Sequence, residues 1–534
     1  MSYFPLEDQI PAQYRPPSPL VMDHYLLNGE LRAWSGPFKT AHSPLLRWRD
    51  GQLAPRELGQ FPLMGEPEAL TALEAAQQAY RHGRGDWPTM PVEQRLEHFA
   101  AFGRRLVERR DQVVNLIMWE IAKSLSAAQK EFDRTVAYIR DTVEALKALD
   151  RTSSRFVIEE GIFGMIRRAP LGVVLCMGPF NYPLNETFTT LIPALIMGNT
   201  VVFKPPKAGI MLYQPLLEAF RDSFPPGVVN TLLGRGSTVT GPLMTSGGID
   251  ALAFIGSSRV ATQLKQQHPR PHRLRSVLGL EAKNPAIILP HADLELTIQE
   301  CVLGSLSFNG QRCTALKTIF VHQSLAERFL AGFSQAVEEL KAGMPWDEGV
   351  SITPLPEEGK TEYLAGLVQD AVDHGARVIN PTGGRVEGTL FKPAILYPVT
   401  SAMRVFHEEQ FGPVIPVVPF TDLEEPINYV VNSNYGQQLS LFGRDPDDMA
   451  RLIDPLVNQV CRLNLNCQCQ RGPDTFPFTG RKDSAEGTLS VSDALRVFTI
   501  RTLVAAKGSP LNKELLNRIV HGRKSKFLST DFIL

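Results

Sequence analysis

The stretch LGVVLCMGPFNYPLNETFTTLIPALIMGNTVVFKPPK, Leu171–Lys207, contains two apolar strands within one short segment. The first, LGVVLCMG, runs into the turn PFNYP, and the second, within GNTVVFKPP, has the length and composition of a buried strand. Two further strands are expected in HRLRSVLGLEAKNPAIILP, His272–Pro290. Helical stretches separate these strands, and such an alternation predicts a mostly parallel, doubly wound α/β sheet.

The rest of the chain predicts a second domain of the same class. Its 534 residues exceed the roughly 250–300 residues at which a single core stops growing. The alternation of helix and strand starts again after Asp293, and the segment Pro91–Leu149 has the spacing of two or three long amphipathic helices. Residues 1–60 are rich in proline and polar groups, so we expect an irregular arm there.

The composition excludes several classes of function. A formal net charge of -1 provides no broad field that would attract nucleic acid or an anionic membrane. The N-terminus lacks the pattern of a secretion signal, and no apolar run is long enough to span a bilayer. Six cysteines are ordinary for a reducing compartment, and the group in Cys461–Gln470 is too closely spaced for structural zinc. We therefore expect a cytoplasmic protein with no metal, nucleic-acid or membrane partner.

Three segments place polar groups where strands end. Asn181 in PFNYP follows a strand, where its amide can donate to a developing oxyanion. Lys204 ends the strand in VVFKPPK, at the edge where nucleotides bind in parallel sheets. Gly256 and Ser257, in FIGSSRVA, form a turn before a helix whose backbone N–H groups can bind a pyrophosphate. Each segment alone also fits an ordinary turn or a surface lysine.

A fourth segment, FNGQRCTA, contains a candidate nucleophile. Cys313 follows a glycine-containing turn and stands beside Arg312. A neighbouring cation lowers the pKa of a thiol and favours the nucleophilic thiolate. The alternative for a single cysteine is an inert buried side chain.

Together, in this order, the four segments resemble the aldehyde dehydrogenase superfamily from about residue 25 to about residue 505. Asn181 precedes Lys204 by 23 residues and Cys313 by 132, as in that family, and HEEQFGPVIPV adds a further family signature. The resemblance implies a Rossmann-type cofactor domain, an α/β catalytic domain and a small oligomerisation hairpin. The corresponding ranges are an arm at 1–60, the cofactor domain at 61–150 and 168–279, the hairpin element at 151–167 and 487–505, the catalytic domain at 280–486 and an extension at 506–534.

The resemblance also implies individual roles. Cys313 would attack the aldehyde, and Asn181 with the Cys313 backbone N–H would stabilise the oxyanion. The residues expected at the cofactor are Lys204, Lys207, Gly256, Ser257, Glu409, Phe411, Pro179 and Phe180. In NAD-preferring relatives a glutamate often stands at the position of Lys207, so a cation there predicts a preference for NADP, with NAD as the alternative. The family forms dimers or tetramers, so we expect a homo-oligomer.

One subfamily fits best. The segments FNGQRCTALK and LNLNCQCQRGPDTFPFTG closely resemble the non-phosphorylating glyceraldehyde-3-phosphate dehydrogenases. In that subfamily the substrate phosphate and hydroxyl are held at positions that correspond to Arg134, Tyr182, Arg312 and Arg471. Guanidinium groups suit a dianionic phosphate because they donate in a fork. For Arg134 alone, a solvated helix face explains the residue equally well.

The hydrolytic step departs from the family pattern. The family reads Glu-Leu-Gly-Gly-Lys where this chain reads Gly279-Leu280-Glu281-Ala282-Lys283, so Gly279 stands at the position of the general base. Positions i and i+2 of a strand share a face, and Glu281 is therefore the expected substitute. Two alternatives stay open: transfer of the acyl group to an acceptor such as coenzyme A, and a catalytically impaired or purely structural relative. A semialdehyde or hydrophobic aldehyde is the alternative substrate.

Overall fold

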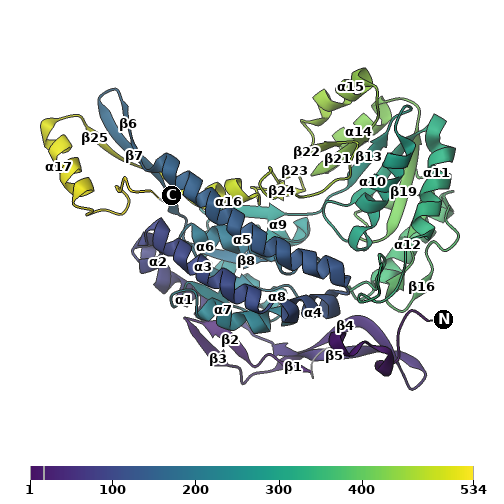
Figure 1. Cartoon of the computed structure of the whole chain (residues 1–534), viewed down its shortest axis with the longest axis horizontal. Coiled ribbons are helices and arrows are strands. Elements are labelled where there is room, and N and C mark those ends of the chain that lie inside the picture. Colours follow the sequence, from purple (N-terminus) through teal and green to yellow (C-terminus); the bar gives the residue numbers. More distant parts are fainter. Residues whose placement is uncertain (1, 16–18, 533–534) are drawn as a thin grey trace.

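The computed structural model describes residues 2–15 and 19–532, and its body consists of two α/β parts (Figure 1). The first contains a sheet with five parallel strands in the order 3-2-1-4-5 of their sequence, followed by an antiparallel edge strand. These strands are β10 (Val229–Thr231), β9 (Thr200–Lys204), β8 (Val173–Met177), β11 (Ala251–Ile255), β12 (Arg275–Gly279) and β24 (Ala485–Glu486). This is the strand order of a Rossmann-type sheet, as expected.

Helices bury this sheet. One layer contains α1 (Glu66–Tyr80), α8 (Gly236–Thr245) and α9 (Ser258–Gln267), and another contains α6 (Asn185–Ile196) with α3 (Val92–Glu108), α5 (Leu125–Ser153) and α16 (Val491–Val497). Every residue of α6, β8 and β9 is buried. The expectation of long helices before residue 150 is confirmed by α3, α4 (Arg110–Ile121) and α5.

The second α/β part contains a sheet of seven strands. Their order is β15 (Arg377–Val378), β18 (Ala394–Tyr397), β19 (Val414–Phe420), β14 (Leu316–His322), β13 (Asn284–Ile288), β21 (Gln438–Phe442) and β22 (Arg462–Leu465). Side chains alternate along β13: Ile287 enters one apolar cluster, whereas Ala286 and Ile288 enter the other. Five helices surround this sheet: α10 (Leu294–Leu306), α11 (Gln323–Glu338), α12 (Lys360–Asp373), α14 (Glu424–Asn432) and α15 (Pro446–Leu456).

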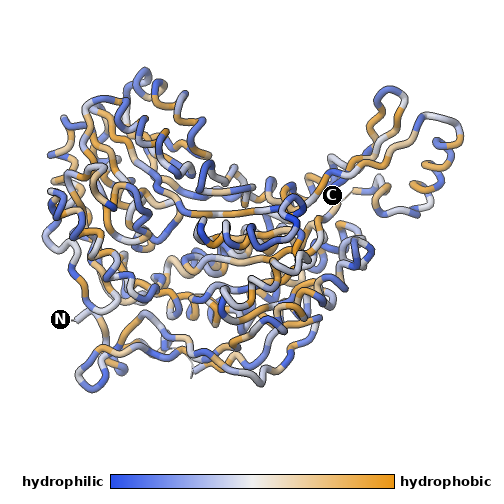
Figure 2. The backbone as a smooth tube through the Cα atoms, turned by 180° about the vertical axis from the view of Figure 1, so that it is seen from behind, coloured by the Kyte–Doolittle hydropathy of each residue, from blue (hydrophilic) through white to orange (hydrophobic). Residues whose placement is uncertain are grey.

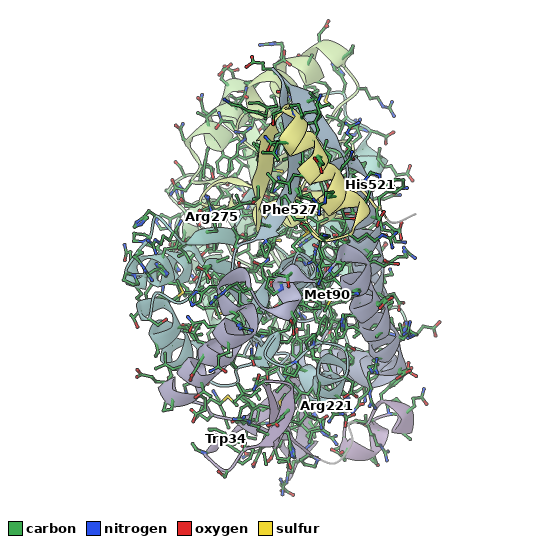
Figure 3. All side chains as sticks on the ribbon, turned by 90° about the vertical axis from the view of Figure 1, so that its left-hand side faces the viewer. Trp34, Met90, Arg221, Arg275, His521 and Phe527 are labelled. Carbon is green, nitrogen blue, oxygen red and sulfur yellow. The ribbon has the colours of Figure 1, made fainter. Side chains whose placement is uncertain are left out.

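A third element protrudes from the body. The strands β6 (Phe156–Glu159), β7 (Ile162–Pro170) and β25 (Thr499–Lys507) form an antiparallel sheet, and α17 (Pro510–His521) follows it. Figure 3 looks toward this element and shows α17 in front of it. In Figure 2 its tube carries many hydrophobic positions although it lies outside the body.

The expectation of an irregular arm at residues 1–60 is wrong. The arm contains β1 (Leu20–Val21), β2 (His24–Leu27), β3 (Glu30–Ala33), β4 (Phe38–Arg49) and β5 (Gln52–Pro62). Asp50 and Gly51 join β4 to β5 with φ values of 51° and 76°. An Asp-Gly pair suits such a turn because both residues tolerate positive φ. The many proline and polar residues of this segment obscured the two strands, so the hairpin was not predicted.

The remaining short α-helices and strands are α2 (Asp86–Thr89), α7 (Leu217–Arg221), α13 (Arg404–His407), β16 (Val386–Glu387), β17 (Leu390–Phe391), β20 (Tyr435–Gly436) and β23 (Arg481–Lys482). Short 3-10 helices lie at Glu7–Gln9, Ala12–Tyr14, Arg81–Gly83, Met211–Leu216 and Ser307–Gly310. Within residues 2–15 and 19–532, no helix combines the length and apolarity needed to cross a bilayer.

Candidate active site

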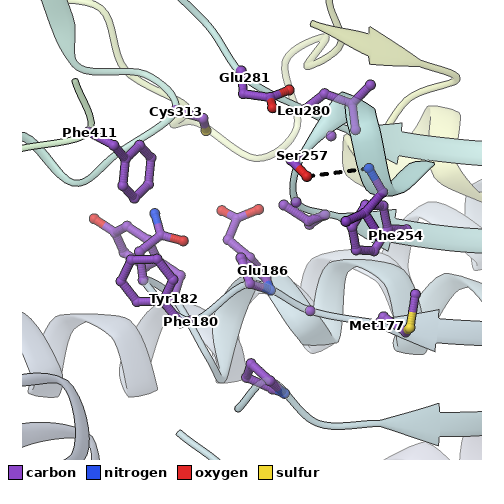
Figure 4. A pocket seen from close by; sticks show the side chains of 18 of the residues that line it. Met177, Phe180, Tyr182, Glu186, Phe254, Ser257, Leu280, Glu281, Cys313 and Phe411 are labelled. Atoms are coloured by element: carbon purple, nitrogen blue, oxygen red, sulfur yellow. Dashed lines mark hydrogen bonds between the residues drawn. The ribbon is translucent and has the colours of Figure 1, made fainter. Parts of the chain in front are cut away.

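A cavity of about 1260 Å³ lies at the carboxyl ends of the cofactor-type sheet (Figure 4). The residues that end β8, β9, β11 and β12, or directly follow those strands, all line it. Cys313, from the other α/β part, lines the same cavity. Ligands bind at this edge of doubly wound sheets, so the topology and the cavity agree on the position of the site.

Asn181 reaches the loop that contains the cysteine. The residue is buried, and its Nδ2 donates a hydrogen bond of 2.8 Å to the backbone oxygen of Gln311. A primary amide has a second N–H, which is available for an oxyanion. Below it, the buried Lys123 Nζ donates to the Asn181 backbone oxygen over 2.7 Å and forms an ion pair with Glu131 over 2.5 Å. The Asn181 turn is therefore held from both sides.

The Cys313 thiol lies among opposing charges. Burial raises its pKa, the Glu186 carboxylate raises it further, and Lys317 and Arg471 lower it. The expectation that Arg312 lowers this pKa is not supported: Arg312 Nη2 donates to the backbone oxygens of helix α10 residues, at 3.2 and 2.9 Å. The cations that favour the thiolate are Lys317, slightly further along the same segment, and the distant Arg471.

The end of β9 carries several cations. Lys204 is buried, which lowers its pKa to about 8, and its Nζ donates to the Pro205 oxygen over 2.8 Å. Lys207 is exposed and lines the cavity. Burial lowers the pKa of Lys39, at the start of β4, and the positive charges of Lys207 and Arg235 lower it further. Lys39, Lys207 and Arg235 therefore form a cationic cluster, with the carboxylate of Glu358 also acting on Lys39.

At the start of α9, Ser257 is the N-cap, and its Oγ accepts a hydrogen bond from Val260 N. Gly256 and Ser257 line the cavity, as expected of a turn at the cofactor. Glu281 reaches the same turn: its Oε2 accepts a hydrogen bond of 2.8 Å from Ser258 N. In this structure Glu281 therefore caps the helix end that was expected to bind a pyrophosphate.

Glu409 and Phe411 lie on the opposite wall. Glu409 Oε1 accepts from Ala282 N over 3.1 Å and forms an ion pair with Lys317 over 2.8 Å. Phe411 faces Phe180 edge-on, with 5.8 Å between ring centroids. Together with Pro179, these residues bring the expected cofactor groups from both α/β parts to one cavity.

Two of the three arginines expected at the substrate phosphate meet on a shared carboxylate. Arg134 donates to Asp474 from Nε and Nη2 over 2.8 and 2.7 Å, and Arg471 Nε donates to Asp474 over 3.1 Å. Arg471 Nη1 forms a further ion pair with Glu186, and its Nη2 donates to the Leu489 oxygen. Arg134, Arg471 and Glu186 line the cavity, as do Tyr182 and Arg312.

Sequence reasoning missed three parts of this arrangement. Glu186 follows Asn181 by five residues within an otherwise apolar and weakly polar helix, and that isolated carboxylate was a readable signal. Lys39 had no such signal, because its strand was taken for irregular chain. The pair of Lys123 and Glu131 is buried, but both residues lie in the segment that was interpreted only as long amphipathic helices.

The aldehyde dehydrogenase family model matches residues 53–504 of this chain. The chain belongs to the aldehyde dehydrogenase family. Its curated relatives include the NADP-dependent glyceraldehyde-3-phosphate dehydrogenase of Streptococcus equinus, 33% identical over 456 residues (83% of this chain and 92% of that protein). The enzyme of the same name from Apium graveolens is 31% identical over 457 residues, with 83% and 89% covered.

Solved structures of aldehyde dehydrogenases agree with this assignment. The NADP-dependent glyceraldehyde-3-phosphate dehydrogenase of Bacillus halodurans C-125, complexed with NADP, superposes with a TM-score of 0.83 at 33% identity, covering 91% of this chain and 99% of that one. The family assignment confirms the predicted aldehyde dehydrogenase fold and the predicted class of enzyme. The roles of individual site residues stay predictions.

Proposed function

We propose that this aldehyde dehydrogenase oxidises glyceraldehyde 3-phosphate to 3-phosphoglycerate with NADP, through a thioester on Cys313. The observation that carries the proposal is a single cavity in which Cys313 and Asn181 lie with three arginines, Arg134, Arg312 and Arg471. Guanidinium groups are the donors that suit a phosphate. The glyceraldehyde-3-phosphate dehydrogenases among the relatives support the same substrate.

The acylation half-reaction follows from the chain's own groups. The Cys313 thiolate attacks the aldehyde carbon, and the free N–H of the Asn181 amide and the Cys313 backbone N–H donate to the oxyanion. When bound, NADP supplies the acceptor for the hydride that leaves this carbon. The product on the enzyme is a thioester of Cys313, which water must then hydrolyse to release the acid.

The cationic cluster fits the extra phosphate of NADP. Lys39, Lys207 and Arg235 lie close enough for the charges of the last two to affect the pKa of the first. The Glu358 carboxylate offsets part of this positive charge, and a 2′-phosphate beside Lys207 would offset more of it. This arrangement supports NADP over NAD.

The protruding element supports a homo-oligomer, dimeric or tetrameric. Ile158, Ile500 and Leu503 on its strands are 61%, 50% and 57% exposed, and Leu511 on α17 is 73% exposed. Exposed apolar side chains grouped in this way are typical of protein interfaces. All six cysteines are free, consistent with the cytoplasm that we propose as the compartment.

A reduction assay tests the proposed reaction. Purified enzyme is mixed with NADP and glyceraldehyde 3-phosphate, and NADPH absorbance and 3-phosphoglycerate are measured with and without coenzyme A and inorganic phosphate. The proposal predicts turnover that needs neither addition. Turnover only with coenzyme A would assign an acyl-transfer reaction, and equal kcat/KM for glyceraldehyde would refute recognition of the phosphate.

A further inference from the structure

The proposed reaction requires a base for thioester hydrolysis, and β12 supplies none at its end. The strand ends at Gly279, which has no side chain. A Cβ at this position would lie 3.3 Å from Ile255 Cγ1, so the space beside the strand is nearly filled by Ile255. General-base catalysis contributes about 10²- to 10⁴-fold to such steps, and a hydrolase of this kind needs a carboxylate from another element.

Glu186 is the carboxylate whose charge acts on the cysteine. It stands in the first turn of α6, directly after the turn that holds Asn181, and it lines the cavity with Cys313. Figure 4 shows its side chain pointing from α6 into the cavity, with Cys313 and Glu281 across the cavity from it. Its negative charge is the second-largest influence on the pKa of the Cys313 thiol, after burial.

One oxygen of Glu186 is available to a water molecule. The ion pair with Arg471 involves Oε2. Among the described residues no hydrogen bond reaches Oε1. Arg471 itself is fixed by Asp474, by the Leu489 oxygen and by the Phe478 ring, 4.4 Å from the guanidinium carbon. Arg471 therefore holds the Glu186 carboxylate in place while leaving an acceptor atom toward the cavity.

Glu281 has a competing contact. Its Oε2 accepts the Ser258 N–H at the start of α9. Its charge does affect Tyr435, on the wall formed by the other α/β part. Glu281 is therefore bound to the helix end expected at the cofactor, whereas Glu186 directly follows the turn that holds Asn181.

We propose that Glu186 is the general base that hydrolyses the Cys313 thioester, a role that rests on the proposed function. The Oε1 atom takes a proton from water as the water oxygen bonds to the thioester carbon. The tetrahedral intermediate then collapses, the bond from carbon to Sγ breaks, and the carboxylic acid leaves with the former water oxygen. Cys313 leaves as the thiolate, and the proton on Glu186 passes to solvent through the cavity.

An ester substrate separates this inference from the proposed aldehyde. p-Nitrophenyl acetate acetylates a reactive cysteine whatever the aldehyde specificity, and acetyl-Cys313 must then be hydrolysed by the same base. For the wild type, Glu186→Gln and Glu281→Gln, the nitrophenolate burst measures acetylation and the steady rate measures hydrolysis. Glu218→Gln, at the exposed Glu218 of α7, is the matched control.

We expect Glu186→Gln to keep a full burst and to lose about 10²- to 10⁴-fold in the steady rate. Mass spectrometry should then find acetyl-Cys313, and hydroxylamine, which attacks a thioester without a base, should release it. The full burst shows that the variant is folded. A wild-type steady rate in Glu186→Gln, or the loss in Glu281→Gln instead, overturns the inference. Normal ester hydrolysis without oxidation of glyceraldehyde 3-phosphate would refute only the proposed substrate.

Discussion

Arg471 and Glu186 form an ion pair on the wall of the cavity that contains Cys313. Both side chains are buried, and Arg471 is also held by Asp474. A buried guanidinium that already has two carboxylate partners binds a substrate phosphate only by sharing its donors. Because this sharing costs free energy, a substitution of Arg471 is a sensitive test of whether the substrate is phosphorylated.

Arg471→Lys should therefore damage phosphate recognition selectively. A lysine cannot reproduce the fork of donors, and a hydrogen bond to a charged group contributes about 1.5–3 kcal/mol. We expect kcat/KM for glyceraldehyde 3-phosphate to fall by roughly 10- to 150-fold, and that for glyceraldehyde to change much less. Arg444→Lys, at an exposed arginine, is the control. Equal losses for both aldehydes would indicate general damage to the site.

Lys207→Glu should shift the cofactor preference toward NAD. At an exposed site the lost attraction and the new repulsion each contribute up to about 1 kcal/mol, so the ratio of kcat/KM for NADP to that for NAD should fall about tenfold or more. Lys39→Gln and Arg235→Gln should each shift the ratio in the same direction, because both lie in the cationic cluster. If none of the three substitutions changes this ratio, the 2′-phosphate binds elsewhere.

The sequence predicted the two sheets because strand composition is a local property. The segments around β8, β9 and β13 are apolar enough to be recognised without their neighbours. Motif spacing likewise predicted that Asn181 and Cys313 share a site, and both line one cavity. The hairpin of β4 and β5 was not predicted because proline and polar residues obscured the alternation of apolar and polar positions along its strands. The Asp50–Gly51 pair is nevertheless typical of a hairpin turn.

The sequence could not predict which charged side chains contact one another at the site. Arg471 and Glu186 are far apart in the chain, so nothing local predicts their ion pair. Arg312 was expected to act on its neighbour Cys313, but adjacent side chains need not point the same way, and Arg312 turns back to α10. Lys317 affects the thiol instead. Adjacency in sequence is a poor guide to electrostatics, which depends on distance in the folded chain.

Asn181→Ala should slow acylation. Its amide is one of two expected oxyanion donors, and loss of one such donor costs about 3 kcal/mol, or 10²- to 10³-fold in rate. The burst of NADPH measured by stopped flow should therefore slow by that factor while its amplitude persists. Thermal unfolding controls for the lost bond to Gln311. A burst as fast as that of the wild type would remove Asn181 from the oxyanion site.

Charged substitutions on the protruding element should break the oligomer. Leu503→Glu on β25 would place a charge where we expect an apolar interface, and desolvating it would cost several kcal/mol. Analytical ultracentrifugation should then show a smaller species than the wild type. Val372→Glu, at a 40% exposed valine on α12, is the control for surface charge. An unchanged mass in Leu503→Glu would contradict an interface there.

The reactivity of Cys313 should depend on pH in a way that Glu186 controls. In the free enzyme, burial and the Glu186 charge raise the pKa of this thiol, so alkylation by iodoacetamide should reach half its limiting rate at a higher pH than for an ordinary cysteine. Glu186→Gln removes the charge that opposes thiolate formation, and the midpoint should move to lower pH.

This prediction gives Glu186→Gln two opposite effects. The thiolate forms more readily, so alkylation at neutral pH should be faster than in the wild type. The same variant should hydrolyse its thioester more slowly, since the proposed base is gone. A residue with only a structural role would slow both reactions together. Alkylation that becomes slower at every pH in Glu186→Gln would therefore show that the carboxylate supports the site's structure and does not oppose the thiolate.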